Sequence, residues 1–328
     1  MPGAFRLLLA SAVVVNHHTR LKIGAASVEL FFILSGYWID RMYGGRYSKL
    51  RRRAAVFVAS RLMRLLPMFQ LFSAIAMVLA ITFHTPAAPQ GLSLALLPNF
   101  TILGYASMPE QPLVPAWSLD IELQFYLLFP LLWLVMVRID AVLGYVTAIL
   151  LVAGGLYLGL VLKDQSAIVF PYLGFFFLGV FASRKAWKPS TALIWAGVLG
   201  AMALVVFTLA MPEARGILIA ADGLPGRSWN TAVNIVLAVL IAPLAISTVT
   251  RPSTRIDRIA GDLSYVVYCS HWVGVVIAGA YLADLRLPAR LPFIAFDIAV
   301  TYAVSLALLL WVDRPLGQFR AAWIGRQP

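Results

Sequence analysis

The sequence predicts an all-α, polytopic integral membrane protein with about ten transmembrane helices and both termini cytoplasmic. Of its 328 residues, 61% are hydrophobic and only 12% are charged, and the mean hydropathy is +0.87. No water-soluble core of this size requires so many apolar residues. The apolar residues also form runs of about 17 to 25 positions, the length of helix that crosses the hydrocarbon layer with its backbone hydrogen bonds satisfied.

Ten such runs follow one another along the chain. The predicted helices lie near residues 4–18, 26–42, 59–83, 117–137, 141–162, 166–182, 190–210, 229–249, 260–282 and 291–312. The first and sixth are short for a full crossing. The longest stretches without a predicted helix are 84–116 and 211–228. We expect one transmembrane domain over residues 1–328, with no fused soluble domain.

The distribution of lysine and arginine predicts the orientation. With a cytoplasmic N-terminus, the inner loops and helix ends hold Arg41, Arg46, Lys49, Arg51, Arg52, Arg53, Arg61, Arg64, Arg138, Arg184, Lys185, Lys188, Arg251, Arg255, Arg258, Arg314, Arg320 and Arg326. The outer side holds Arg20, Lys22, Lys163, Arg215, Arg227, Arg286 and Arg290. This positive-inside bias favours an even number of crossings. The net charge of +12 therefore reflects membrane topology, and no nucleic-acid partner is expected.

The first predicted helix carries two polar residues suited to chemistry. Arg6 and His17 are eleven positions apart, which on a helix returns to within about 20° of the same face and separates them by roughly 16 Å along the axis. An arginine inside a membrane helix costs several kcal/mol near the bilayer centre, so it is usually retained because the protein uses it. Pairing with a carboxylate for assembly is the alternative role for Arg6.

Other polar residues fall on stripes of later helices. Ser118, Glu122 and Tyr126 are spaced i, i+4, i+8, and Ser264, Tyr268 and His271 are spaced i, i+4, i+7. Arg61 and Arg64 begin the third predicted helix. The candidate substrate-binding residues on these stripes are Trp117, Ser118, Tyr126, Tyr268 and His271. The single Cys269 and the scattered histidines predict neither a disulfide framework nor a metal site.

These motifs together resemble acyltransferase family 3, the integral membrane O-acyltransferases that modify polysaccharides and lipopolysaccharides. The matching residues are Arg6 and His17; Ser27-Val28-Glu29 and Ser35-Gly36-Tyr37; Arg61, Arg64 and Pro67; Trp117-Ser118-Leu119, Glu122, Phe125-Tyr126 and Pro130; Phe177 and Gly179; Ser264-Tyr265, Tyr268 and His271; and Asp313-Arg314-Pro315. The chain departs from the family where Gly3 replaces an acidic residue and where Asp313 stands in place of glutamate.

The resemblance implies a ten-helix transferase of groups other than aminoacyl groups, located in the inner or plasma membrane of a bacterial cell envelope. It would move an acyl group, most often acetyl from acetyl-CoA, to a hydroxyl of a polysaccharide such as exopolysaccharide, of lipopolysaccharide or of a glycosylated small molecule. The resemblance also implies that Arg6 handles the coenzyme A donor. The expected partners are acyl-CoA, a carbohydrate or glycolipid acceptor and the lipid bilayer, and no permanently bound cofactor is expected.

The residues themselves suit this chemistry. A sugar hydroxyl needs a base, and the neutral imidazole of His17 can take its proton and return it to the leaving thiolate. Arg6, Arg61 and Arg64 keep their charge and can hold a phosphate or a thioester carbonyl. Glu122 could orient His17 or neutralise Arg6. Two alternatives use the same residues: a proton-coupled membrane transporter and a non-catalytic assembly subunit.

Overall fold

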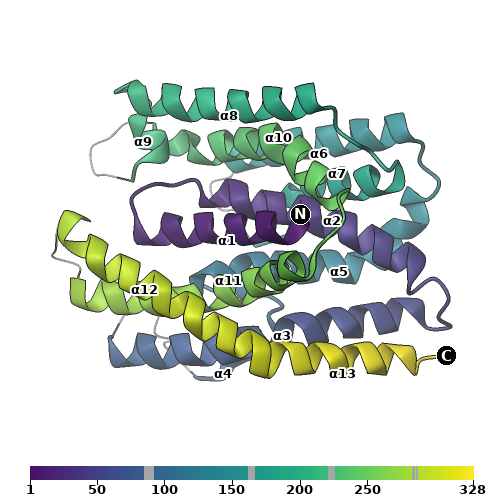
Figure 1. Ribbon diagram of the computed structural model, residues 1–328, viewed down its shortest axis with the longest axis horizontal. Helices are drawn as coiled ribbons and strands as arrows, with labels where there is room; N and C mark the ends of the chain where they lie inside the picture. Colours follow the sequence, from purple (N-terminus) through teal and green to yellow (C-terminus); the bar gives the residue numbers. More distant parts are fainter. Residues whose placement is uncertain (85–91, 162–166, 221–225, 283–284, 286) are drawn as a thin grey trace. The chain divides into compact units, whose positions relative to one another are not determined.

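The computed structural model describes residues 1–84, 92–161, 167–220, 226–282, 285 and 287–328. Over these ranges the protein is helical, and its extended backbone pairs only in an isolated bridge between Leu21 and Ile219 (Figure 1). All ten predicted helices are present: α1 Pro2–His18, α2 Gly24–Gly45, α3 Arg53–Thr82, α5 Trp117–Met136, α6 Ala141–Val161, α7 Leu173–Arg184, α8 Thr191–Ala210, α10 Asn230–Val249, α11 Arg255–Leu282 and α12 Leu287–Leu308. The prediction of an all-helical fold is therefore confirmed.

Three further helices lie where the sequence predicted none. They are α4 Leu92–Thr101, α9 Arg215–Leu218 and α13 Arg314–Gly325. The expectation of non-helical stretches at 84–116 and 211–228 is thus wrong in part, because helices this short lack the long apolar run that predicts a transmembrane helix. Helix α4 is stabilised by contacts with α3. Gln70 of α3 donates to the Phe100 carbonyl at 2.9 Å, and Ser73 of α3 donates to Asn99 at 2.7 Å.

Six helical stretches within the described residues are long and apolar enough to cross a membrane. They are Arg53–Thr82, Val114–Met136, Thr191–Ala210, Asn230–Val249, Arg255–Leu282 and Pro288–Gly325. Two shorter apolar helices span Val142–Leu158 and Phe170–Arg184. Ten crossings and cytoplasmic termini remain predictions, and two basic residues used for the orientation, Lys163 and Arg286, lie outside the described residues.

The chain divides into two compact units. The first unit comprises residues 1–44, 132–165 and 169–264, and the second comprises residues 45–131, 166–168 and 265–328. The first unit therefore contains α1, α2, α6 to α10 and the start of α11, together with the end of α5. The second contains α3, α4, most of α5, the remainder of α11, α12 and α13.

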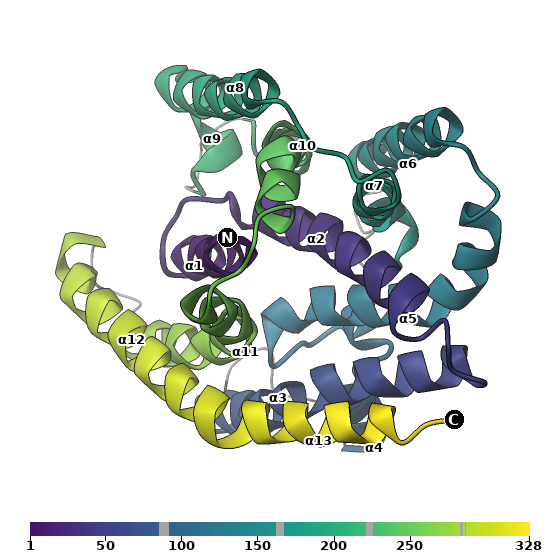
Figure 2. The same ribbon diagram turned by 45° about the vertical axis from the view of Figure 1, so that its right-hand side comes forward.

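The first unit is built from closely packed helix pairs. Helix α6 packs on α7 and α8 packs on α10, as Figures 1 and 2 both show. Helices α2 and α7 approach through Gly36 and Gly179. A Cβ atom on Gly36 would lie 2.1 Å from the Phe176 carbonyl oxygen, and one on Gly179 would lie 1.9 Å from that of Ile33. Only glycine allows this close crossing of the two helices.

The second unit has an aromatic core between α3 and α5. Phe57, Phe125 and Phe129 are buried, with ring centroids 6.0 Å apart for Phe57 and Phe129 and 5.4 Å apart for Phe125 and Phe129. Helix α13 lies alongside α3 in both views (Figures 1 and 2). A π-helical segment, Leu309–Asp313, joins α12 to α13. This segment carries Asp313, one of the motif residues.

Candidate functional site

Arg6 and His17 lie on one uninterrupted helix of the first unit. Helix α1 runs from Pro2 to His18, so the face that the two residues share in sequence exists in the structure. Both side chains are half-buried, and each takes part in an interaction within the protein. His18 follows on the same helix about 100° further round and therefore faces away from the Arg6 stripe.

The N-terminus of α1 is held by an acidic residue from α11. The backbone N–H of Ala4 donates to Asp257 Oδ1 at 2.9 Å, and Ser253 donates to Asp257 Oδ2 at 2.6 Å. A Cβ atom on Gly3 would lie 1.6 Å from the Asp257 carbonyl oxygen, so glycine is required at this contact. A carboxylate at a helix N-terminus is stabilising because it faces the positive end of the helix dipole. Asp257 thus places a negative charge from another helix at the N-terminus of α1.

The other end of α1, next to His17, is fixed by a network of amides and one ammonium. Asn16 Oδ1 accepts from the Gly24 N–H at 3.0 Å, and Lys22 Nζ donates to the carbonyls of Asn16 and Thr19 at 2.9 and 3.2 Å. Fully buried Asn234 accepts from the Ala26 N–H at 3.0 Å.

The same loop is bonded to α10 a second time. Asn230 and Asn234 both donate to the Lys22 carbonyl, at 2.8 and 3.1 Å. The amide of Asn230 also donates to the Ile217 carbonyl at 2.6 Å. Each end of α1 is therefore tied to another helix by buried or part-buried hydrogen bonds, which favours a fixed position for the Arg6 and His17 stripe.

In the second unit, Glu122 and Tyr126 interact as their spacing predicts. The Tyr126 hydroxyl donates a short hydrogen bond to Glu122 Oε1. Tyr126 is buried, and Glu122 is half-buried with further interactions. Arg61 on α3 lies 5.8 Å from the centroids of both the Tyr126 and Phe57 rings. Three of the predicted residues, Arg61, Glu122 and Tyr126, thus form one cluster.

Ser118 and Tyr268 are also brought together, with Oγ and Oη 2.7 Å apart. Both hydroxyls also lie within hydrogen-bond distance of the Pro115 carbonyl oxygen, at 2.9 Å for Tyr268 and 3.2 Å for Ser118. One turn along, Trp272 donates to the Pro112 carbonyl at 2.8 Å. Both side chains of α11 therefore hold the segment that leads into α5, and Tyr268 has its donor occupied within the protein.

His271 is fully buried beside Tyr268, with ring centroids 6.0 Å apart, and its Nδ1 lies 3.2 Å from the Val267 carbonyl oxygen. These contacts fit a packing role, and substrate binding by His271 stays a prediction. Trp117 begins α5 and is half-buried. The segment before α5 is well fixed, because Leu113 donates its backbone N–H to the Tyr105 hydroxyl at 2.7 Å. Burial raises the pKa of Tyr105 well above its usual value.

Arg64, a predicted donor-binding residue, is paired with Asp313. Its Nη1 atom lies 2.8 and 2.7 Å from the two carboxylate oxygens. The guanidinium also lies 4.9 Å from the centroid of the Tyr265 ring, whose hydroxyl donates to the Leu65 carbonyl at 2.6 Å. Arg6 and His17 belong to the first unit, and the other predicted residues belong to the second. Any pairing of His17 with Glu122 remains a prediction.

Two features are not among the predicted site residues, although one of them, Glu29, belongs to one of the motifs named above. Glu29 is buried on α2, and no described residue forms a hydrogen bond with its Oε2 atom. A carboxylate inside an apolar run was the available signal. Asp40 and Arg184 form a part-buried ion pair, with Nε and Oδ1 2.8 Å apart, although they are 144 positions apart in the sequence. No local pattern indicates such a long-range pair.

Comparison with known proteins places these motifs in context. A family model described as an acyltransferase domain matches residues 4–312. The exopolysaccharide production protein ExoZ of Rhizobium meliloti (strain 1021) is 26% identical over 329 residues, which cover 94% of each chain. A protein of Komagataeibacter xylinus, provisionally named membrane-bound transacylase BcsY, is 26% identical over 343 residues that cover 94% of this chain and 80% of that protein. No solved structure matches the chain significantly.

Proposed function

Because this chain belongs to acyltransferase family 3 and is therefore a membrane acyltransferase, we propose that it moves an acetyl group from acetyl-CoA to a hydroxyl of a carbohydrate. The names of its two relatives, one an exopolysaccharide production protein and one a transacylase, support an exopolysaccharide or its glycolipid precursor as the acceptor. The inner or plasma membrane of a bacterium is the corresponding location.

The observation that supports this mechanism best is the unbroken α1, which carries Arg6 and His17 on one face. His17 takes the proton of the acceptor hydroxyl while the hydroxyl oxygen attacks the thioester carbonyl carbon. The carbon–sulfur bond then breaks, and the thiolate leaves with the proton that His17 returns. Products are an O-acetyl ester and free coenzyme A, so protons and acyl groups balance.

Arg6 and Glu122 would support this base. Arg6 is permanently charged and holds a donor phosphate or stabilises the developing oxyanion of the thioester. Glu122 either orients His17 and stabilises its protonated form or neutralises Arg6. The network around Asn16, Lys22 and Asn234 keeps the His17 end of α1 in place, and correct placement accounts for a large part of catalysis by proximity.

The predicted orientation gives the reaction a direction. With Arg6 near the inner surface and His17 about three turns further out, acetyl-CoA binds from the cytoplasm and the acceptor reaches in from the outer face. Sealed inverted vesicles that contain the protein should therefore consume added acetyl-CoA, whereas right-side-out vesicles should not. The opposite result would remove the cross-membrane scheme.

The same groups would serve a proton-coupled transporter or an assembly subunit, and one experiment separates these roles from catalysis. Purified protein in detergent, given radiolabelled acetyl-CoA, should transfer or hydrolyse the acetyl group. Neither a carrier nor an assembly subunit breaks the thioester. An Arg6→Ala variant that still supports full acceptor acetylation would favour the assembly role.

A further inference from the structure

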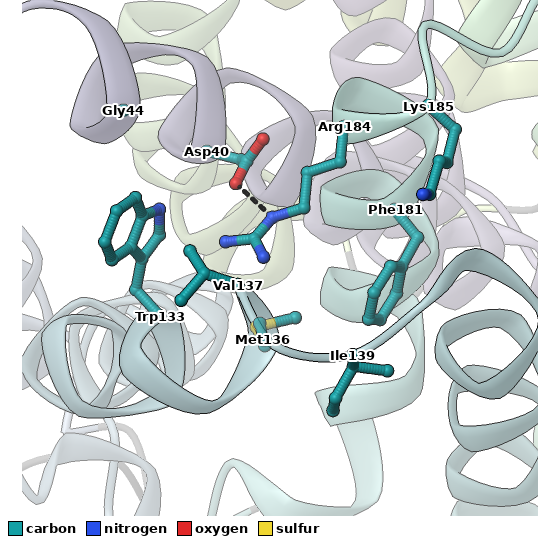
Figure 3. Close-up of a pocket in the computed structure, with 9 residues that line it drawn as sticks. All are labelled: Asp40, Gly44, Trp133, Met136, Val137, Ile139, Phe181, Arg184 and Lys185. Atoms are coloured by element: carbon teal, nitrogen blue, oxygen red, sulfur yellow. Dashed lines mark hydrogen bonds and ion pairs between the residues drawn. The ribbon is translucent and has the colours of Figure 1, made fainter.

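The first unit contains a cavity of about 350 Å³ at the ends of three helices (Figure 3). Helix α2 contributes Asp40. The end of α5 contributes Trp133, followed by Val137 just after the helix, and the end of α7 contributes Arg184, followed by Lys185. The distribution of lysine and arginine predicts that all three helix ends lie on the cytoplasmic side of the membrane. The cavity therefore opens where soluble anions and inner-leaflet headgroups are both within reach.

Arg184 directs unused hydrogen-bond donors into this cavity. Its Nε donates to Asp40 Oδ1 at 2.8 Å, and its guanidinium carbon lies 5.7 Å from the centroid of the Trp133 ring. Within the described residues nothing accepts a hydrogen bond from Nη1 or Nη2, and Figure 3 shows both pointing across the cavity toward Trp133 and Val137. The side chains of Arg184 and Asp40 are only 16% and 9% exposed, so this guanidinium is held in a fixed orientation.

Lys185 is exposed at the rim and is not needed to complete α7. The last turn of that helix is closed by its own backbone, because Ala186 donates to the Ser183 carbonyl at 3.1 Å and Trp187 donates to that of Ala182 at 2.9 Å. This is a Schellman motif, which satisfies the terminal carbonyl groups that a lysine often covers. The Lys185 ammonium thus remains available to a ligand.

The remaining wall is apolar and consists of Met136, Val137, Ile139 and Phe181. Among the described residues that line the cavity, the charged groups are one carboxylate, Asp40, and two cations, Arg184 and Lys185, which leaves one excess positive charge. A singly charged phosphate diester would neutralise that charge. A planar guanidinium with two free nitrogens can hold two phosphate oxygens at once, and such bonds are the stronger kind.

We propose that this cavity binds a phosphate ester, with Arg184 and Lys185 on the phosphate and the attached chain against the apolar wall. Two molecules carry this chemistry to the inner face of a membrane. One is an anionic phospholipid, and the other is the diphosphate-linked chain of acyl-CoA. The first source is independent of the proposed acyl transfer, whereas the second rests on it.

The experiment uses the purified full-length protein and two probes, phosphatidylglycerol and acetyl-CoA. Native mass spectrometry compares the affinity of the protein for phosphatidylglycerol with its affinity for the zwitterionic lipid phosphatidylcholine. A transfer assay measures the KM for acetyl-CoA. The variants are Lys185→Gln and the double variant Asp40→Asn/Arg184→Gln, which removes the ion pair without leaving one charge buried alone. Lys188→Gln is the matched control, because Lys188 is exposed nearby but does not line the cavity.

The double variant should bind one of the two probes at least tenfold more weakly than the wild-type protein. Lys185→Gln should lower the affinity for the same probe several-fold, and Lys188→Gln should leave the affinity for both probes unchanged. If only the binding of phosphatidylglycerol is lost, the ligand of the cavity is a lipid. If only the KM for acetyl-CoA rises, the ligand is the acyl donor. Unchanged affinity for both probes in a folded double variant would overturn the proposal. If wild-type protein binds phosphatidylglycerol at this cavity yet transfers no acetyl group, the proposed function fails while the site stands.

Discussion

Arg64 points a single guanidinium nitrogen at both carboxylate oxygens of Asp313, at 2.8 and 2.7 Å. The side chains are 19% and 10% exposed, and the residues are 249 positions apart in the sequence. The pair joins α3 to the π-helical segment before α13. Arg64 therefore has a structural role in addition to any contact with the donor.

The two roles of Arg64 can be separated by changing each partner. Arg64→Ala should lower the free energy of unfolding by about 3 kcal/mol, because it leaves the Asp313 carboxylate buried without its cation. It should also raise the KM for acetyl-CoA. Asp313→Asn keeps the arginine, so it should destabilise the protein while leaving that KM nearly unchanged. Thermal unfolding in detergent and initial rates measure the two effects. Equal KM values in all three proteins would show that Arg64 is only structural.

If Glu122 has the role proposed above, Glu122→Gln should lower kcat by about 10²-fold while the protein inserts normally, because glutamine has no negative charge with which to stabilise protonated His17 or neutralise Arg6. Tyr126→Phe is the matched variant. It removes the hydrogen bond to Glu122 Oε1 but keeps the carboxylate, so its loss of activity should be much smaller. Transfer rates normalised to membrane abundance distinguish the two variants. If Glu122→Gln turns over as fast as the wild-type protein, Glu122 is not a catalytic residue.

His17→Ala should reduce acetyl transfer by roughly 10² to 10⁴-fold at normal membrane abundance, since a general base contributes about that factor and alanine offers no substitute. His18→Ala should retain most activity, because α1 is unbroken through both residues and only His17 shares the Arg6 face. Radiolabelled transfer with purified variants is the measurement. A dead His18→Ala protein beside an active His17→Ala protein would refute both the shared face and the choice of base.

Gly179→Ala should destabilise the first unit, because the new methyl group would lie 1.9 Å from the Ile33 carbonyl oxygen and force α2 and α7 apart. Gly154 on α6 has no heavy atom within 4 Å of the corresponding position. Gly154→Ala should therefore be neutral or stabilise the protein by up to about 1 kcal/mol through helix propensity. Thermal unfolding of both variants tests this contrast, and equal melting temperatures would show that the helices separate without cost.

The sequence predicted those parts of the fold that depend on local periodicity. Each of the ten predicted helices has an apolar run, and the Glu122 and Tyr126 contact follows from an i, i+4 spacing. Helices α4, α9 and α13 have no comparable signal, because neighbouring segments rather than their own length stabilise them.

In the candidate site, contacts between residues that are far apart in the sequence could not be predicted. Arg64 pairs with Asp313 and Arg184 pairs with Asp40, and in each case the two residues meet only after folding. The contact of Asp257 with the start of α1 is a third example, because Asp257 is 253 positions from Ala4. A single sequence does not show which distant residues meet in this way.

The lengths of α3 and α13 have a consequence for how far the protein reaches. A helix of 30 residues, such as α3, is about 45 Å long, whereas the hydrocarbon layer is about 30 Å thick. The 15 Å by which α3 exceeds that layer is close to the length of α13, whose 12 residues extend about 18 Å. Helix α13 lies along α3, and Arg46, in the loop between α2 and α3, donates to the Ala321 carbonyl of α13 at 3.2 Å. The Arg51 N–H also donates to the Pro328 carbonyl at 2.9 Å, so the segment before α3 is bonded to the C-terminal end of the chain. We expect the basic start of α3 to extend beyond the hydrocarbon layer with α13 packed along it.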